Sequence, residues 1–259
     1  MHITPNPSHK NMFAIGGNTS SFRSWLVCTS AALFFFYEFI QMNMLNSLGS
    51  YLMQEYQITA TQLGGLSAWY FYANLSFLLV AGLLLDRFST RRIILCAMIS
   101  CVIGTLLMAF AHSLVLTAIS RFIAGIGSAF CFLSSIRLAS RWFPPRRMAL
   151  LAGLIVTMAM LGGVVAQTPL AMLAQAVGWR TAVLWIAALG GVIIFVIWKF
   201  VFDYPPGMHA THINEQEELK TLGIWKAKRI AFLNKQNWLA GLYPIKLKLQ
   251  PFYGYESCH

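Results

Sequence analysis

Charged side chains are scarce in this sequence. They make up 10% of its 259 residues, whereas hydrophobic residues make up 58%, and an ordinary soluble domain carries about 25% charged residues. This composition argues against a chain whose only solvent is water. Segments of alternating apolar and polar residues, which a membrane-spanning β-barrel would need, are missing as well. We therefore expect an all-α membrane protein, because a helix satisfies its own backbone hydrogen bonds within lipid.

Several functional signals are also missing. The five cysteines match no metal-ligand spacing, and His209 and His212 have no further ligands near them, so we expect no metal site and no cofactor. The first 22 residues lack the charged-then-apolar pattern of a cleaved signal peptide. No serine–histidine pair or carboxylate cluster lies at membrane depth. The sequence does not favour an intramembrane enzyme.

Long apolar runs are abundant. Each is long enough for the roughly 20 residues that a helix needs to cross the hydrocarbon core. We expect six transmembrane helices, arranged as two three-helix repeats. The runs cover residues 25–45, 63–85, 93–111, 114–136, 148–173 and 180–202.

The basic residues are placed asymmetrically along these runs. If the N-terminus is cytoplasmic, 17 of the 19 lysines and arginines fall on the cytoplasmic side, and only Arg121 and Arg180 lie toward the other side. This matches the positive-inside rule. It explains the net charge of +11 without a nucleic-acid partner. We expect a multi-pass protein of the cell membrane with both termini in the cytoplasm.

Composition also divides the chain into segments. Residues 1–24 are expected to be a disordered cytoplasmic tail, 25–203 the six-helix bundle, and 204–232 a cytoplasmic loop after the helix stop Pro205-Pro206-Gly207. Residues 233–243 resemble the start of a seventh helix, but prolines and lysines follow where apolar residues should continue. We interpret 233–259 as a truncated or frameshifted end. A genuine six-helix protein with a short amphipathic C-terminus is the alternative.

The most specific motif is a charged turn between the second and third runs, which we call the signature loop (residues 82–92). Its anchors are Gly82, Asp86, Arg87, Arg91 and Arg92. The turn resembles the G-x-L-x-D-R-x-G-x-R-R loop of the major facilitator superfamily, with Ser89 at the inner glycine. The resemblance implies a loop that contacts the second half of a twelve-helix carrier and biases its inward–outward equilibrium. A generic positive turn is the alternative.

Two further motifs predict close helix packing. The fourth run carries Arg121, Gly125, Gly127 and Ala129, which resemble the superfamily's R-x-x-Q-G-x-G-x-A motif with Ala124 at the glutamine. Gly125 and Ala129 are one turn apart and form a small face for a neighbouring helix. Gly162 and Gly163 resemble the end of a fifth-helix antiporter motif, G-P-x-x-G-G. Its Gly-Pro is replaced here, which weakens a drug-antiporter interpretation.

Two charges stand inside the apolar runs. Glu38 lies about 20 Å into the first helix by helical rise, and Arg121 reaches a similar depth from the opposite side of a core about 30 Å thick. Charges at such depth mark substrate or proton pathways, so we predict that Glu38 and Arg121 approach each other in a cavity. A static salt bridge, a structural buried arginine and a snorkelling arginine are the alternatives. Weaker cavity candidates are Gln41, Tyr72, Asn74 and Gln167.

The resemblance implies a function. It suggests the N-terminal half of a secondary carrier for a small polar solute or organic anion, with protons as a possible coupling ion. Tyr37-Glu38-Phe39, the aromatic second helix and residues 141–146 are similar to a bacterial branch related to lysosomal dipeptide transporters. A non-transporting remnant or interaction subunit is the alternative. Six helices alone would expose cavity residues to lipid, so we expect a homodimer or a missing second half as partner.

Overall fold

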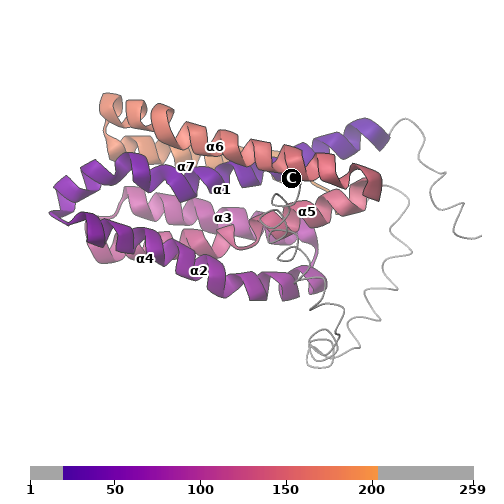
Figure 1. The fold of residues 1–259 in the computed structure, drawn as a ribbon, viewed down its shortest axis with the longest axis horizontal. Coiled ribbons are helices and arrows are strands. Elements are labelled where there is room, and N and C mark those ends of the chain that lie inside the picture. Colours follow the sequence, from indigo (N-terminus) through magenta and orange to yellow (C-terminus); the bar gives the residue numbers. More distant parts are fainter. Residues whose placement is uncertain (1–19, 204–259) are drawn as a thin grey trace, which may run out of the picture. The chain divides into compact units, whose positions relative to one another are not determined.

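The computed structural model describes residues 20–203, and every regular element within that range is helical (Figure 1). Six helices or helix pairs in this range are long and apolar enough to cross a membrane. This confirms the predicted all-α membrane bundle. Residues 1–19 of the expected tail and the segments after residue 203 lie outside the described residues, whereas residues 20–24 belong to the first helix. The elements are α1 (Ser20–Tyr56), α2 (Ala60–Arg87), α3 (Thr90–Ala109), α4 (Leu114–Ser128), α5 (Cys131–Trp142), a short 3-10 turn (Pro145–Arg147), α6 (Met148–Val177) and α7 (Trp179–Phe200).

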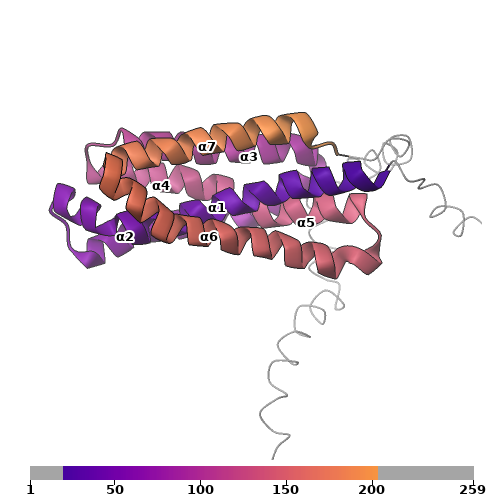
Figure 2. The same cartoon turned by 90° about the horizontal axis from the view of Figure 1, so that it is seen from above.

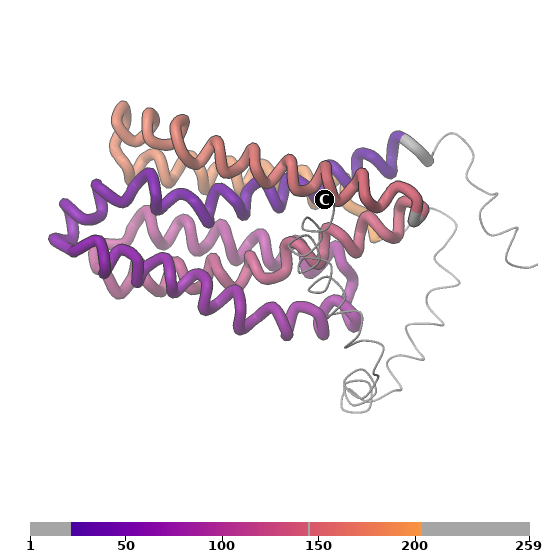
Figure 3. The backbone as a smooth tube through the Cα atoms, viewed as in Figure 1, coloured from indigo at the N-terminus to yellow at the C-terminus, as the bar shows by residue number. Residues whose placement is uncertain are grey.

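The six spans run side by side along one axis, and successive spans alternate in direction (Figures 1 and 2); α4 and α5 together form the fourth span. The trace in Figure 3 shows the signature loop turning at the same end of the bundle as the connection from α5 to α6. We call this the loop end. The turns that follow α1, α3 and α6 lie at the opposite end, and there Gly178 adopts φ 84° between α6 and α7, a backbone conformation that favours glycine.

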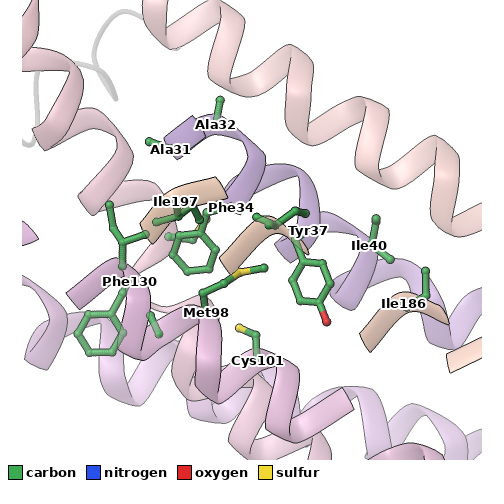
Figure 4. Packing of buried hydrophobic residues seen from close by; sticks show 14 of the residues in the cluster. Ala31, Ala32, Phe34, Tyr37, Ile40, Met98, Cys101, Phe130, Ile186 and Ile197 are labelled. Carbon is green, nitrogen blue, oxygen red and sulfur yellow. The ribbon is translucent and has the colours of Figure 1, made fainter. Parts of the chain in front are cut away.

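α1 forms the centre of the bundle and contacts every other α-helix, most extensively α6. Phe34, Tyr37 and Ile40 of α1 are fully buried against Met98 of α3 and Ile197 of α7 (Figure 4). The predicted run ended at residue 45, but α1 continues to Tyr56 and has 37 residues. At 1.5 Å per residue such a helix spans about 55 Å, more than the hydrocarbon core of about 30 Å.

The fourth span is broken, which the sequence did not predict. Instead of one helix over 114–136, α4 ends at Ser128 and α5 begins at Cys131. The Ser128 hydroxyl donates to the Gly125 carbonyl at 2.8 Å, and the Phe130 N–H donates to Gly127 at 3.3 Å in a tighter turn. Two glycines within three residues weaken a helix, so this break falls where the helix propensity is lowest.

Three of the predicted packing residues lie at close helix crossings. A methyl group added to Gly125 would collide with the Tyr70 carbonyl of α2, and one added to Gly127 with the Ala97 carbonyl of α3. A methyl on Gly162 would collide with the Phe36 carbonyl of α1. The absence of Cβ therefore allows backbone to approach backbone.

The other two packing candidates differ. A methyl on Gly163 would meet only ordinary neighbours, the nearest being Asn43 Nδ2 at 3.7 Å. Ala129 is buried, but it lies in the turn between α4 and α5. At Gly163 and Ala129, unlike at the three glycines above, packing does not depend on a close approach of two backbones.

Candidate functional site

A buried polar cluster lies within the bundle where α1, α2, α3 and α4 meet. Glu38 and Arg121 are 6% and 2% exposed. The Tyr70 hydroxyl of α2 donates to Glu38 Oε1 at 2.9 Å, and the Arg121 guanidinium carbon lies 4.5 Å from the centre of the same tyrosine ring. Tyr70 therefore contacts both charged groups, and it is itself 1% exposed.

Sequence reasoning placed Glu38 and Arg121 at one depth, and the structure brings both to Tyr70. The two side chains do not form a direct ion pair: the ion pairs within residues 20–203, taken up to an N···O distance of 4.0 Å, join other residues. The guanidinium instead donates from Nη2 to the Gln41 backbone carbonyl at 2.8 Å. The arrangement is a carboxyl group and a guanidinium separated by an aromatic ring.

Gln41 extends the cluster toward α3. Its Nε2 donates to Thr105 Oγ1 at 2.6 Å, and the Tyr37 hydroxyl lies 3.1 Å from the same oxygen. Thr105 in turn donates to the Cys101 carbonyl at 2.8 Å. These bonds fix α1 against α3 directly beside the Glu38 and Arg121 side chains.

Four side-chain atoms of the cluster lack a hydrogen-bond partner within the described range. They are Glu38 Oε2, Gln41 Oε1, and Arg121 Nε and Nη1. Buried polar atoms are nearly always hydrogen-bonded, and leaving one unsatisfied costs about 1–3 kcal/mol. A cluster with both free donors and free acceptors can bind a small polar molecule that carries complementary groups.

The remaining cavity candidates lie outside this cluster. Tyr72 is 62% exposed, and the Gln167 side chain is exposed, although its backbone carbonyl accepts from Ser47 Oγ at 3.1 Å. Asn74 is half-buried and donates to Ser128 Oγ at 2.6 Å. Tyr70 belongs to the aromatic run of residues 69–72, which could line a cavity, and the sequence did not distinguish it from the other three residues.

The signature loop is held by two acids. Asp86 pairs with Arg137 of α5 at 3.0 Å, but its side chain is 74% exposed. Asp203, just after α7, accepts from the Arg91 N–H at 2.9 Å and from the Ser89 hydroxyl. The sequence did not predict this contact of Asp203, since only the folded chain brings it to the loop.

Ser89 replaces the inner glycine of the loop pattern and has its own structural role. Its φ of −57° needs no glycine, and its side chain accepts from the Arg92 N–H as the cap of α3. The Arg91 side chain donates to the Trp198 carbonyl near the end of α7. Helices α3 and α7 therefore cap each other's ends at the loop.

The other loop anchors are more exposed. Arg87 and Arg92 have exposed side chains, whereas Gly82 is half-buried beside Leu133. Next to it lies a groove of about 490 Å³ between α2 and α5, lined by Leu85 and Ile136 among others. The groove lies at the loop end and shares no lining residue with the polar cluster.

We predict that Asp203 stabilises the loop more than Asp86 does. Asp203→Ala removes an acceptor from the first turn of α3, whose N–H groups need capping, and should speed amide hydrogen exchange there about tenfold. Asp86→Ala is the matched control, because exposed ion pairs contribute about 0–1 kcal/mol. Exchange measured by mass spectrometry over residues 88–95 checks this. Equal effects of the two variants would contradict the capping role.

Comparison with known proteins assigns the chain to a family of membrane proteins. The chain belongs to the Major Facilitator Superfamily, whose family model matches residues 31–245. This confirms the resemblance seen in the signature loop.

Similar proteins include the probable sulfoacetate transporter SauU of Cupriavidus necator, 24% identical over 69% of this chain and 41% of that protein. The hexuronate transporter of Bacillus subtilis is 24% identical over 64% of this chain and 40% of that protein. The chain spans about two fifths of the length of these relatives.

Solved structures share the fold. A bacterial homologue of the human lysosomal transporter Spinster, inward-facing and unoccupied, has a TM-score of 0.60 at 18% identity, over 86% of this chain and 51% of that one. A D-xylose–proton symporter has a TM-score of 0.60 at 16% identity, over 82% and 55%. Six spans of this multi-pass membrane protein thus superpose on about half of each neighbour.

Proposed function

We propose that the chain forms one six-helix half of a secondary carrier for small organic anions, with Arg121 as the partner of the anionic group. The observation that carries this proposal is a guanidinium, 2% exposed, whose Nε and Nη1 have no hydrogen-bond partner within residues 20–203. A guanidinium presents its N–H groups in a fork that matches a carboxylate or sulfonate. Two relatives are named as transporters of organic anions of this kind, sulfoacetate and hexuronate.

Glu38 is the candidate for proton coupling. It is a buried carboxyl group whose Oε2 has no partner among the described residues, and it is joined to the Arg121 region through Tyr70. Ionisable groups at membrane depth typically serve as proton relays. A proton on Glu38 would offset the charge that an anion brings into the cluster.

Transport needs a second half. Alternating access in this fold is a rocking of one helix bundle against another around a site near the midplane. We propose that the exposed Tyr72 and Gln167 face that second half, which is either a second copy or a further segment. An interaction subunit without transport activity is the competing function, and solute binding distinguishes the two.

A solute panel tests the proposal. Thermal unfolding of the purified chain is followed in sulfoacetate, a hexuronate, and xylose, with sulfate at equal ionic strength as control. A ligand at a hundred times its Kd adds about 2.7 kcal/mol to the native state, a rise in Tm on the order of 5 °C. We expect that rise for the organic anions, a smaller one for sulfate, which also offers oxygens to a guanidinium, and none for xylose. Equal shifts for all solutes, or no shift, would reject the proposal.

We also propose that the loop end faces the cytoplasm, from the asymmetry of the basic residues. His112, at the opposite end after α3, and Arg146, at the loop end after α5, both have exposed side chains. In intact cells a membrane-impermeant maleimide should label His112→Cys and leave Arg146→Cys unlabelled. Permeabilised cells, in which both should react, are the control. Labelling of Arg146→Cys in intact cells would contradict the proposed orientation and place the loop end outside the cell.

A further inference from the structure

Tyr70 separates the two charged groups of the polar cluster. Its hydroxyl provides the hydrogen bond to Glu38 Oε1, at 2.9 Å, and its ring lies 4.5 Å from the Arg121 guanidinium carbon. A cation over an aromatic face is held by the ring quadrupole and needs no carboxylate. One side chain therefore stabilises the acid through its hydroxyl and the base through its ring.

The position of Tyr70 is fixed by the backbone. Its carbonyl group lies against Gly125 of α4, where an added methyl would collide with it. Gly125 is one helical turn after Arg121. The close crossing of α2 and α4 therefore sets the ring beneath the guanidinium, and neither helix can slide without moving both residues.

Loss of the hydroxyl would change the partner of Glu38. Oε2 already lacks a hydrogen-bond partner in the described range, and Oε1 would lose the tyrosine. The donors left without partners in the cluster belong to Arg121, at Nε and Nη1. A buried carboxylate without donors is costly, so Glu38 would turn toward the guanidinium and occupy the N–H groups that we assign to the solute.

We infer that Tyr70 is a positioning residue that prevents a direct Glu38–Arg121 ion pair and thereby keeps Arg121 available to an anionic solute. The role in solute binding rests on the proposed function, whereas the separation of the two charges does not. Among the described residues, the titratable or charged groups that interact with Glu38 are Tyr70 of α2, Cys101 of α3, Arg121 of α4 and Cys131 of α5. Arg121 is the cation among them.

The first experiment needs no solute. Tm is measured for Glu38→Gln, Arg121→Gln and their combination, both with Tyr70 present and in the Tyr70→Phe background. With Tyr70 present we expect a small coupling between the two changes, because both side chains share Tyr70 as a partner. In the Tyr70→Phe background the combined shift should fall much further below the sum, as for a new ion pair. The same coupling in both backgrounds would overturn the inference.

The second experiment measures the affinity for a hexuronate. Tyr70→Phe keeps the ring and should weaken binding about tenfold. Binding should recover when Glu38→Gln is added to Tyr70→Phe, because the neutral amide cannot form an ion pair with Arg121. Tyr56→Phe is the matched control, because it removes a hydroxyl that donates to the Ala111 carbonyl at 3.0 Å and accepts from Thr117 at 3.1 Å, with neither Glu38 nor Arg121 as a partner.

The outcomes separate the two claims. Unchanged affinity in Tyr70→Phe, or a loss that Glu38→Gln does not rescue, contradicts the positioning role. If the unsubstituted chain binds no hexuronate, the proposed function fails, and the Tm comparison still decides whether Tyr70 keeps Glu38 and Arg121 apart.

Discussion

Gly162→Ala is expected to lower the stability of the bundle by about 3 kcal/mol or more, the upper range for overpacking. Gly162 lies where α6 crosses α1, and an added methyl would collide with the Phe36 carbonyl and the backbone atoms beside it. Backbone cannot rotate away as a side chain can. The helices would have to separate along the most extensive contact of the bundle.

Gly153→Ala is the matched control. Gly153 lies in the same helix, and nothing within 4 Å would meet its added methyl. Because alanine favours a helix over glycine by about 0.8–1 kcal/mol, this change should raise stability slightly. Equilibrium unfolding in mixed detergent measures both. A gain in stability for Gly162→Ala as well would show that helix propensity, and not the α1–α6 crossing, decides stability here.

Arg121→Gln is expected to weaken hexuronate binding about a hundredfold. Truncating one partner of a buried charge pair costs about 2–5 kcal/mol, and 1.4 kcal/mol corresponds to tenfold in affinity. Arg121→Lys keeps the charge without the planar fork and should recover only part of the loss. Arg146→Gln, which removes an exposed arginine at the loop end, should leave the affinity unchanged. Loss of binding in Arg146→Gln equal to that in Arg121→Gln would point to a nonspecific charge effect.

The fold was largely predictable because crossing a membrane imposes a length and a composition. The apolar runs from 93 to 111 and from 180 to 202 match α3 and α7 within a few residues. The break after Ser128 was not predicted. In the sequence, Gly125 and Gly127 indicate close helix packing. The sequence does not show that they pack against two different helices, or that α4 ends where they do so.

The site was predictable in part. Helical rise places Glu38 and Arg121 at one depth, but it cannot show what lies between them. Tyr70 and Tyr72 are two residues apart, which is about 200° around a helix, and so one is buried and the other is 62% exposed. The choice between them depends on where α4 packs. Asp203 and the signature loop are joined only by tertiary contact.

The central claim is that Arg121 binds the negative charge of the solute. The most direct test is equilibrium binding of glucuronate and glucose to the purified chain, because the two differ chiefly by a carboxylate in place of a hydroxymethyl group. We expect saturable binding of glucuronate, at least tenfold weaker binding of glucose, and loss of this preference in Arg121→Gln. Equal affinity for the two sugars, or a preference for glucuronate that survives in Arg121→Gln, would contradict the claim.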